Sequence, residues 1–154
     1  MANETQEKQS IFSLDKIYVK DISLEIPNAP KIFLNREQPK IELKINFTNT
    51  KIDENVYQVV LRGVVDAKIA NEQMFLIEVE QAGIFTLKNI EPALVEQIQN
   101  VECPSILFPY LRELVSDLTT RAGFLPVVLS PVNFAGLYQQ QKNAMAQDTS
   151  KSIN

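Results

Sequence analysis

Four segments in the first half of the chain alternate apolar and polar residues, which is the pattern of strands with one buried face. The clearest is Lys40–Thr48, in which Ile41, Leu43, Ile45 and Phe47 share one parity. The other three segments are 11–26, 56–70 and 74–85, and polar turns separate the last three of the four. Consecutive strands of this kind favour antiparallel pairing. We therefore expect a four-stranded, meander-like sheet with one covered face.

The first of these segments loses its alternation in the middle. One parity holds Phe12, Leu14, Tyr18, Ile22, Leu24 and Ile26, but Ile17 and Val19 fall on the other. A bulge shifts parity within a strand, so we expect one long strand that is bulged near its centre. Residues 49–55 are expected to form a polar turn. The connection 27–39 is too long for a tight hairpin and carries the apolar residues Ile32, Phe33 and Leu34.

Helical periodicity replaces the alternation in the second half. Leu107, Leu111, Leu114 and Leu118 form a stripe that Tyr110 and Val115 widen. The stripe predicts a helix over 105–122, with Pro109 tolerated near its start and Gly123 ending it. After an apolar loop from Phe124 to Pro131, Asn133 can cap a second helix that carries Phe134, Leu137, Tyr138 and Gln141 on one side. Strands followed by helices indicate an α+β fold.

Length and polarity set the expected boundaries. The 154 residues fit one folded domain, 11–146, between polar tails at 1–10 and 147–154 that we expect to be disordered. No apolar run reaches the length of a membrane span, and the first residues lack a signal-peptide core. These features predict a cytoplasmic protein without direct membrane insertion.

The composition excludes several kinds of chemistry. Without a histidine, the chain has no histidine base and no histidine metal ligand, and the single Cys103 excludes an internal disulfide. Cys103 precedes a predicted helix but has no base to activate it, so a buried structural role is expected. A net charge of −4 and a pI near 4.9 argue against nucleic-acid binding. No catalytic constellation emerges, and an enzyme is not expected.

Two pairs of carboxylates remain, Asp21 with Glu25 and Glu78 with Glu80. The members of each pair share one face of a strand. They form either a solvated sheet face or a docking surface for a basic partner, to which Leu76 would add an apolar contact. The apolar loops at Ile32–Leu34 and Phe124–Leu129 are by composition expected to belong to the core rather than to a groove. Two amphipathic helices can cover one face of the sheet, but the fourth strand carries Met74 and Leu76 on one face and Phe75 and Ile77 on the other. The apolar surface left over predicts an oligomer, either structural or binding a small ligand.

Several motifs taken together resemble the SecB protein-export chaperone family. They run in order from about residue 11 to 141: Lys20–Ser23 (KDIS), Pro27–Pro30 (PNAP), Gly83–Phe85 (GIF), Cys103–Glu113 (CPSILFPYLRE) and Pro131–Phe134 (PVNF). The resemblance implies a homotetramer, built as a dimer of dimers, that uses neither ATP nor a cofactor. Such a protein holds secretory preproteins unfolded in the cytoplasm and delivers them to the translocase motor SecA.

The resemblance also implies two sets of site residues. The surface that docks the zinc-bearing C-terminal tail of SecA would comprise Asp21, Glu25, Leu76 and Glu78. Candidates for the client groove are Phe33, Phe108, Tyr110, Phe124 and Phe134. One departure concerns the connection between the first two strands, where many relatives carry a tryptophan near the position of Arg36 and Glu37 and this chain has none. The groove wall there is expected to be less aromatic.

Overall fold

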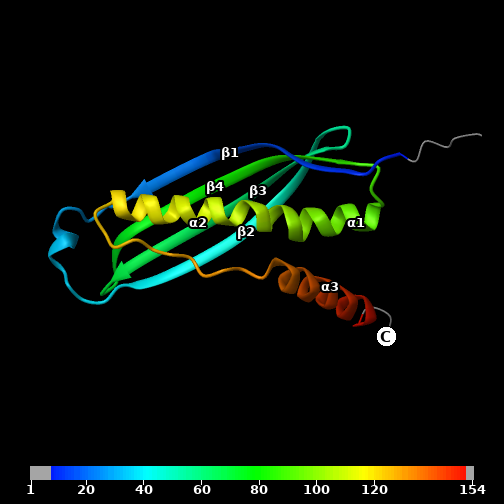
Figure 1. The fold of residues 1–154 in the computed structure, drawn as a ribbon. Coiled ribbons are helices and arrows are strands. Elements are labelled where there is room, and N and C mark those ends of the chain that lie inside the picture. Colours follow the sequence, from blue (N-terminus) through cyan, green and yellow to red (C-terminus); the bar gives the residue numbers. More distant parts are fainter. Residues whose placement is uncertain (1–7, 152–154) are drawn as a thin grey trace, which may run out of the picture.

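A single antiparallel sheet carries helices on one face in the computed structural model, which describes residues 8–151 (Figure 1). Its strands are β1 (Ile11–Glu25), β2 (Lys40–Asp53), β3 (Val56–Ile69) and β4 (Glu72–Lys88). The helices that follow are α1 (Pro92–Gln97), the π-helical segment η2 (Ile98–Glu102), α2 (Cys103–Arg121) and α3 (Phe134–Lys151). A 3-10 turn, η1 (Lys31–Leu34), lies between β1 and β2. The predicted α+β class is confirmed.

The strand order is β1-β4-β3-β2, so only the last three strands form the expected meander. β1 pairs with β4, and the connection of residues 26–39 carries the chain across one end of the sheet to the opposite edge (Figure 1). This is the order of a Greek key, in which one strand returns beside a three-stranded meander. The alternation within each strand could not reveal this strand order, because alternation specifies which face a residue lies on and not which strands pair.

Two bulges in β1 explain its confused parity. The register with β4 shifts between Leu14 and Lys16 and again between Val19 and Asp21. Ile17 therefore pairs with Gly83 on the helix-covered face and packs against the core. Tyr18 pairs with Ala82 on the opposite face, so the prediction that it shares a face with Phe12 and Leu14 is wrong. The predicted bulge is confirmed. Ile17 and Val19, which break the alternation, lie between the two register shifts.

β2 is longer than the sequence predicts. The strand continues to Asp53, with Asn49 paired to Val59 and Lys51 to Tyr57, and the chain turns only at Glu54 and Asn55. Asn55 has a positive φ of 60°, which asparagine tolerates in such turns. The predicted turn at 49–55 is wrong because this end of an edge strand is exposed on both faces. Backbone pairing, which leaves no hydrophobic pattern, continues the strand there.

The helical region is one continuous rod from Pro92 to Arg121, so it begins well before residue 105, where the helix is predicted to start. α1, η2 and α2 follow each other without a break, and the widened turn η2 lies directly before Pro104. A proline ring clashes with the carbonyl group four residues back, and a π-helical turn is one way to relieve such a clash. The sequence predicts that Pro109 is tolerated because it lies near the start of the helix. This prediction is wrong, since Pro109 lies inside the rod.

The core lies between α2 and the middle strands β3 and β4. Leu107, Leu111 and Val115 are fully buried. Close approach depends on Gly83, where a Cβ atom would lie 3.0 Å from Leu107 Cδ2 and 2.8 Å from Phe85 Cε2. Tyr110, which was expected to widen the buried stripe, is 48% exposed on the outer side of the helix.

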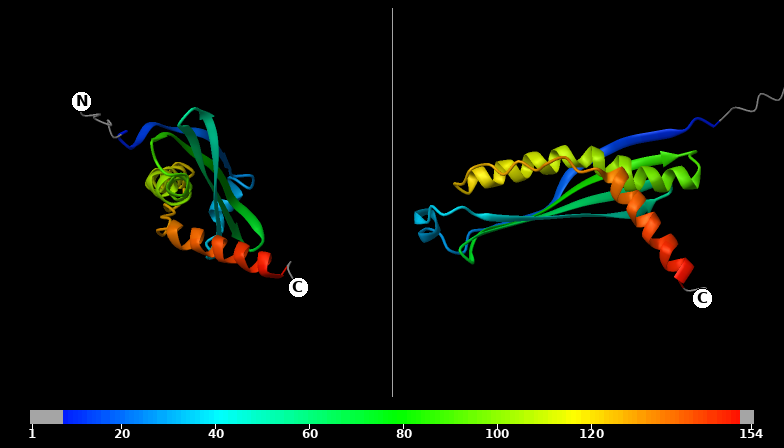
Figure 2. Two further views of the ribbon diagram at one scale, coloured as in Figure 1. Left: turned by 90° about the vertical axis from the view of Figure 1, so that its right-hand side faces the viewer. Right: turned by 90° about the horizontal axis from the view of Figure 1, so that it is seen from below.

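α3 leaves the layer of α2 and crosses the β2 edge of the sheet (Figure 2). Phe134 is its one buried residue within the described range. The helix continues to Lys151, so a disordered tail beginning at 147 is wrong for residues 147–151. Alanine, glutamine and lysine favour helix without packing, which explains how this polar segment extends α3. At the other end, Ser10 Oγ donates to the Asn89 carbonyl (2.8 Å), while residues 1–7 of the predicted N-terminal tail lie outside the described range.

Candidate functional site

An apolar groove of about 610 Å³ opens at the end of the sheet where the β1–β2 connection meets the loop after α2. The connection forms one wall, the loop forms the other, and the ends of β2, β3 and β4 form the floor. The groove is lined by Ile32, Phe33, Asn35, Glu37, Pro39, Ile41, Ile69, Met74, Phe75, Gly123, Phe124, Leu125, Pro126, Val127 and Val128. We call this surface the apolar groove.

Aromatic contacts join the two walls to the floor. Phe33 from η1 stacks on Phe124 from the loop, with ring centroids 5.0 Å apart, and Phe124 lies 5.3 Å from Phe75 of β4. The loop reaches Phe33 because Gly123 ends α2 with a φ of 89°, in the left-handed region that favours glycine. A Cβ atom at Gly123 would also lie only 3.2 Å from Phe33 Cε1. The walls are therefore in contact at their base.

The loop wall exposes large apolar side chains that line the groove: Leu125 is 88% exposed and Val128 70%. Leu34, on the connection, is 82% exposed but does not line the groove. Their sequence neighbours Ile32 and Leu129 are buried, at 2% and 4% exposure. The expectation that these loops belong to the core is therefore met at the anchoring residues and fails at the rim. Exposed leucine and valine flanked by buried anchors are typical of a surface that receives an apolar partner.

The structure brings together only two of the five groove candidates, Phe33 and Phe124. Phe108 and Phe134 are core residues, 6% and 3% exposed, with ring centroids 6.1 Å apart. Phe134 also borders a second cavity, of about 290 Å³, between β2 and α3. Tyr110 lies on the outer side of α2 beside Pro109 and Glu113, away from the groove.

Sequence reasoning did not single out Ile41 and Met74 as part of the groove. Ile41 is 44% exposed although it belongs to the cleanest alternation in the chain. Its parity indicates the covered face, but α2 packs on β3 and β4 and leaves the Ile41 end of β2 uncovered. A pattern of alternation reports the face of a residue and not how far the covering helix extends over it.

The predicted docking residues lie together on the face of the sheet that the helices leave open. Glu25 of β1 pairs directly with Leu76 of β4, and Asp21 pairs with Glu80. Glu78, between these two pairs along β4, lies 3.5 Å from the Arg62 guanidinium of β3. Asp21, Glu25, Glu78 and Glu80 around Leu76 form what we call the acidic face. Its charge is largely uncompensated, which suits a basic partner.

Cys103 has no place in either surface. It is fully buried, and this burial, with a smaller contribution from the neighbouring Glu102 carboxylate, raises its pKa from 9.0 to about 12. The thiol is thus an inert core group at neutral pH. Among residues 8–151, no three acidic or cysteine side chains converge so as to hold a metal ion. In that range no helix combines the length and apolar character needed to cross a bilayer.

Comparison with known proteins is consistent across sequence and fold. The family described as "Preprotein translocase subunit SecB" matches residues 5–145. A protein-export protein SecB from Nitrosospira multiformis is 50% identical over 89% of this chain and 86% of its own length. The SecB protein from Aromatoleum aromaticum is 51% identical over 92% of this chain and 90% of its own.

A solved structure of a SecB-like chaperone has a similar fold. The SecB-like chaperone of Mycobacterium tuberculosis, solved with a ChAD peptide from an antitoxin, superposes with a TM-score of 0.65. The match covers 79% of this chain and 90% of that one, at 17% identity, and so concerns the fold alone. Because the family match spans nearly all the described residues and relatives share half of their residues with it, this chain belongs to the SecB family of protein-export proteins.

Proposed function

We propose that the protein is an ATP-independent holdase, which keeps secretory preproteins unfolded in the cytoplasm by binding their apolar segments in the apolar groove. The observation that carries this proposal is the rim formed by Leu125 and Val128, which are 70% or more exposed above an aromatic base. Water-exposed apolar side chains gain free energy when a client covers them. A folded client would hide the segments that this surface recognises.

The β2 strand suits a client in an extended conformation. β2 is an edge strand of the described sheet, and Ile41 and Leu43 on its helix side are 44% and 39% exposed. An extended chain can pair with the free backbone groups of an edge strand while its alternate side chains enter neighbouring pockets. Backbone pairing is independent of client sequence, which suits a chaperone with many clients.

We assign a second role to the acidic face. It would bind the basic, zinc-bearing C-terminal tail of the motor SecA, with Asp21, Glu25 and Glu78 attracting the charge and Leu76 supplying an apolar contact. The helices cover the opposite side of the sheet, so a protomer could hold a client and SecA at the same time. Simultaneous binding is what delivery to the translocase requires.

The exposed surface of β1 supports a homotetramer arranged as a dimer of dimers. Phe12, Leu14, Val19 and Ile22 are each more than a third exposed, and β1 forms the second free edge of the described sheet. A long free edge flanked by apolar side chains invites pairing with another chain. A light-scattering mass measurement tests this part of the proposal directly, since a stable monomer would contradict it.

The holdase activity itself is tested by diluting an unfolded preprotein into buffer with and without stoichiometric protein. We expect delayed refolding and reduced aggregation without added nucleotide. Unchanged refolding and aggregation would rule the proposal out. Preferential binding of a compact apolar ligand over unfolded chains would instead favour a small-ligand-binding oligomer, the alternative that the composition leaves open.

A further inference from the structure

The loop that forms the outer wall of the apolar groove has no regular secondary structure, yet its middle residue is held at both backbone groups. The Val127 N–H donates to Thr119 Oγ1 at 2.9 Å, and the Val127 carbonyl accepts from Ser116 Oγ at 2.7 Å. Both hydroxyl groups belong to the last two turns of α2. The two hydroxyl groups thus form the hydrogen bonds that a neighbouring strand would otherwise make to the N–H and carbonyl groups of Val127.

Thr119 is a buried polar side chain that the holdase proposal does not use. It is fully buried, and its hydroxyl group donates toward the carbonyl groups of Val115 and Ser116, both at 3.0 Å, while accepting from Val127. Because the Thr119 hydroxyl hydrogen points toward these two carbonyl groups, the oxygen lone pair that accepts from the Val127 N–H has a fixed direction. Because buried polar groups are costly to leave unpaired, this contact fixes the loop more firmly than an exposed one would.

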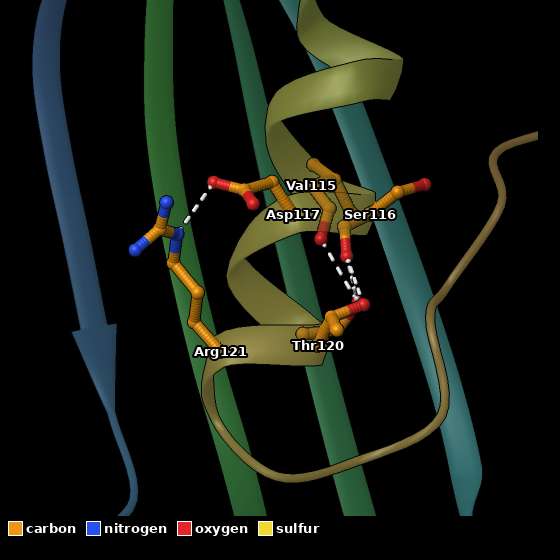
Figure 3. Close-up of polar contacts among 6 residues, drawn as sticks. Val115, Ser116, Asp117, Thr120 and Arg121 are labelled. Carbon is orange, nitrogen blue, oxygen red and sulfur yellow. Dashed lines mark hydrogen bonds and ion pairs between the residues drawn. The ribbon is translucent and has the colours of Figure 1, made fainter.

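The contact lies between the residues that form the rim. Leu125 precedes Val127 by two positions and Val128 follows it, and both are exposed while Val127 faces inward. Figure 3 shows the side chain of Ser116 pointing toward the loop, whereas Arg121 points away to its ion pair with Asp117. Holding Val127 at both its N–H and its carbonyl sets the orientation of the peptide planes on either side. The orientation of Leu125 and Val128 follows from it.

We propose that Thr119 and Ser116 are positioning residues for client binding, which hold the outer wall of the apolar groove open before a client arrives. This inference rests on the proposed holdase function. A wall already in its binding conformation loses less conformational entropy on binding, so its affinity for clients is higher. Without the two hydroxyl groups, the loop would sample other conformations and only a fraction of molecules would be competent to bind.

Three substitutions at this site separate positioning from packing. Thr119→Val keeps the side-chain shape and removes the hydroxyl group, whereas Thr119→Ser keeps the hydroxyl group and removes a buried methyl. Ser116→Ala removes the second contact. The matched control is Thr120→Val on the same turn, because Thr120 is exposed and its hydroxyl group bonds only to the Ser116 carbonyl within the helix (2.9 Å).

The experiment measures two quantities for each intact protein: amide hydrogen exchange at Val127, and the affinity for a fluorescent, unstructured apolar peptide. We expect Thr119→Val and Ser116→Ala to accelerate Val127 exchange and to weaken peptide binding roughly 3- to 10-fold. Thr119→Ser and Thr120→Val should behave like the wild type. If packing were all that mattered, the order of the two Thr119 variants would be reversed.

The outcomes distinguish this inference from the function on which it rests. If the wild type fails to bind the peptide, the holdase proposal fails, and Val127 exchange still reports whether the hydroxyl groups hold the loop. If the wild type binds and Thr119→Val binds equally well with unchanged exchange, the positioning role is wrong and the holdase proposal stands.

Discussion

Phe33 and Phe124 stack with their ring centroids 5.0 Å apart and their planes at 22°. One ring comes from the connection between the first two strands and the other from the loop after α2, so the pair joins two distant segments of the chain. The contact holds the walls of the apolar groove together at the base and leaves the rim free. This division between a packed base and an exposed rim underlies the first prediction.

Replacing Leu125 by serine should weaken client binding without changing stability. The Leu125 side chain is 88% exposed, so its removal costs the folded protein little, whereas a client that covers it loses a buried contact. We expect peptide affinity to fall roughly 5-fold or more, as for the loss of one buried apolar side chain. Fluorescence anisotropy measures the affinity and urea unfolding the stability. Met145→Ser on α3, 73% exposed, is the control, and an equal loss in both variants would argue against the groove.

Phe108→Ala should act on stability instead. The ring is 6% exposed and meets Phe134 in the core, so truncation leaves a cavity that costs about 3–5 kcal/mol. Urea denaturation at fixed protein concentration measures the change, since oligomerisation also contributes to apparent stability. Tyr110→Ala, on the outer side of α2, serves for comparison. A Phe108 variant of unchanged stability but impaired client binding would return this residue to the list of groove residues.

The contact between α2 and the sheet makes Gly83 intolerant of a side chain. A Cβ atom there would lie 2.8 Å from Phe85 Cε2, whereas one at Gly63 would lie 3.3 Å from the Leu111 methyl groups. Gly83→Ala should therefore destabilise the protein by about 1–3 kcal/mol, through overpacking, and Gly63→Ala by less. Thermal unfolding of the two variants checks this order, and the reverse order would contradict the tighter packing at Gly83.

Charge reversal on the acidic face should weaken binding to the SecA tail. Asp21→Lys or Glu78→Lys places a cation among carboxylates that would otherwise attract the basic partner, and we expect a loss of roughly 10-fold at low salt. Glu42→Lys makes the same change in net charge on the same face of the sheet, but at the β2 edge. Titration calorimetry at two salt concentrations measures the binding. Equal losses in all three variants would indicate general electrostatics rather than a defined docking surface.

The buried thiol predicts a pH dependence of stability. The pKa of Cys103 rises from 9.0 to about 12 on folding, because burial disfavours the thiolate. Above pH 9 the unfolded chain loses this proton while the folded chain keeps it, so the free energy of unfolding falls as pH rises toward 12. Cys103→Ala should remove this contribution. Urea unfolding of both proteins between pH 8 and pH 10.5 measures it, and a constant difference in stability across that range would contradict the buried assignment.

Most of the local structure could be predicted from the sequence because it depends on short-range patterns. The four alternating segments are strands, the leucine stripe is α2, and Gly123 ends that helix as expected. The errors share a cause. The end of β2 and the last turns of α3 are polar and exposed, so no apolar periodicity marks them. The rod from Pro92 to Arg121 contains Pro104 and Pro109, a residue type that normally ends a helix.

Of the two candidate sites, one follows from short-range sequence patterns and the other does not. The acidic face could be predicted because residues two apart on a strand share a side, and the register then joins Glu25 to Leu76. The apolar groove could not be predicted from composition, since Leu125 and Leu129 are the same residue type but are 88% and 4% exposed. Only the contact between two segments that are distant in sequence decides which residue is an anchor and which belongs to the rim.

The sequence by itself determined the faces of the strands, the apolar stripe of the helix and the family to which the chain belongs. The tertiary structure decided that β1 pairs with β4, that α2 leaves the Ile41 end of β2 uncovered, and that the loop after α2 meets the β1–β2 connection at Phe33. The physical reason lies in the range of the interactions. Side-chain periodicity follows from the geometry of a single element, whereas a groove exists only where the packing of several elements leaves apolar surface uncovered.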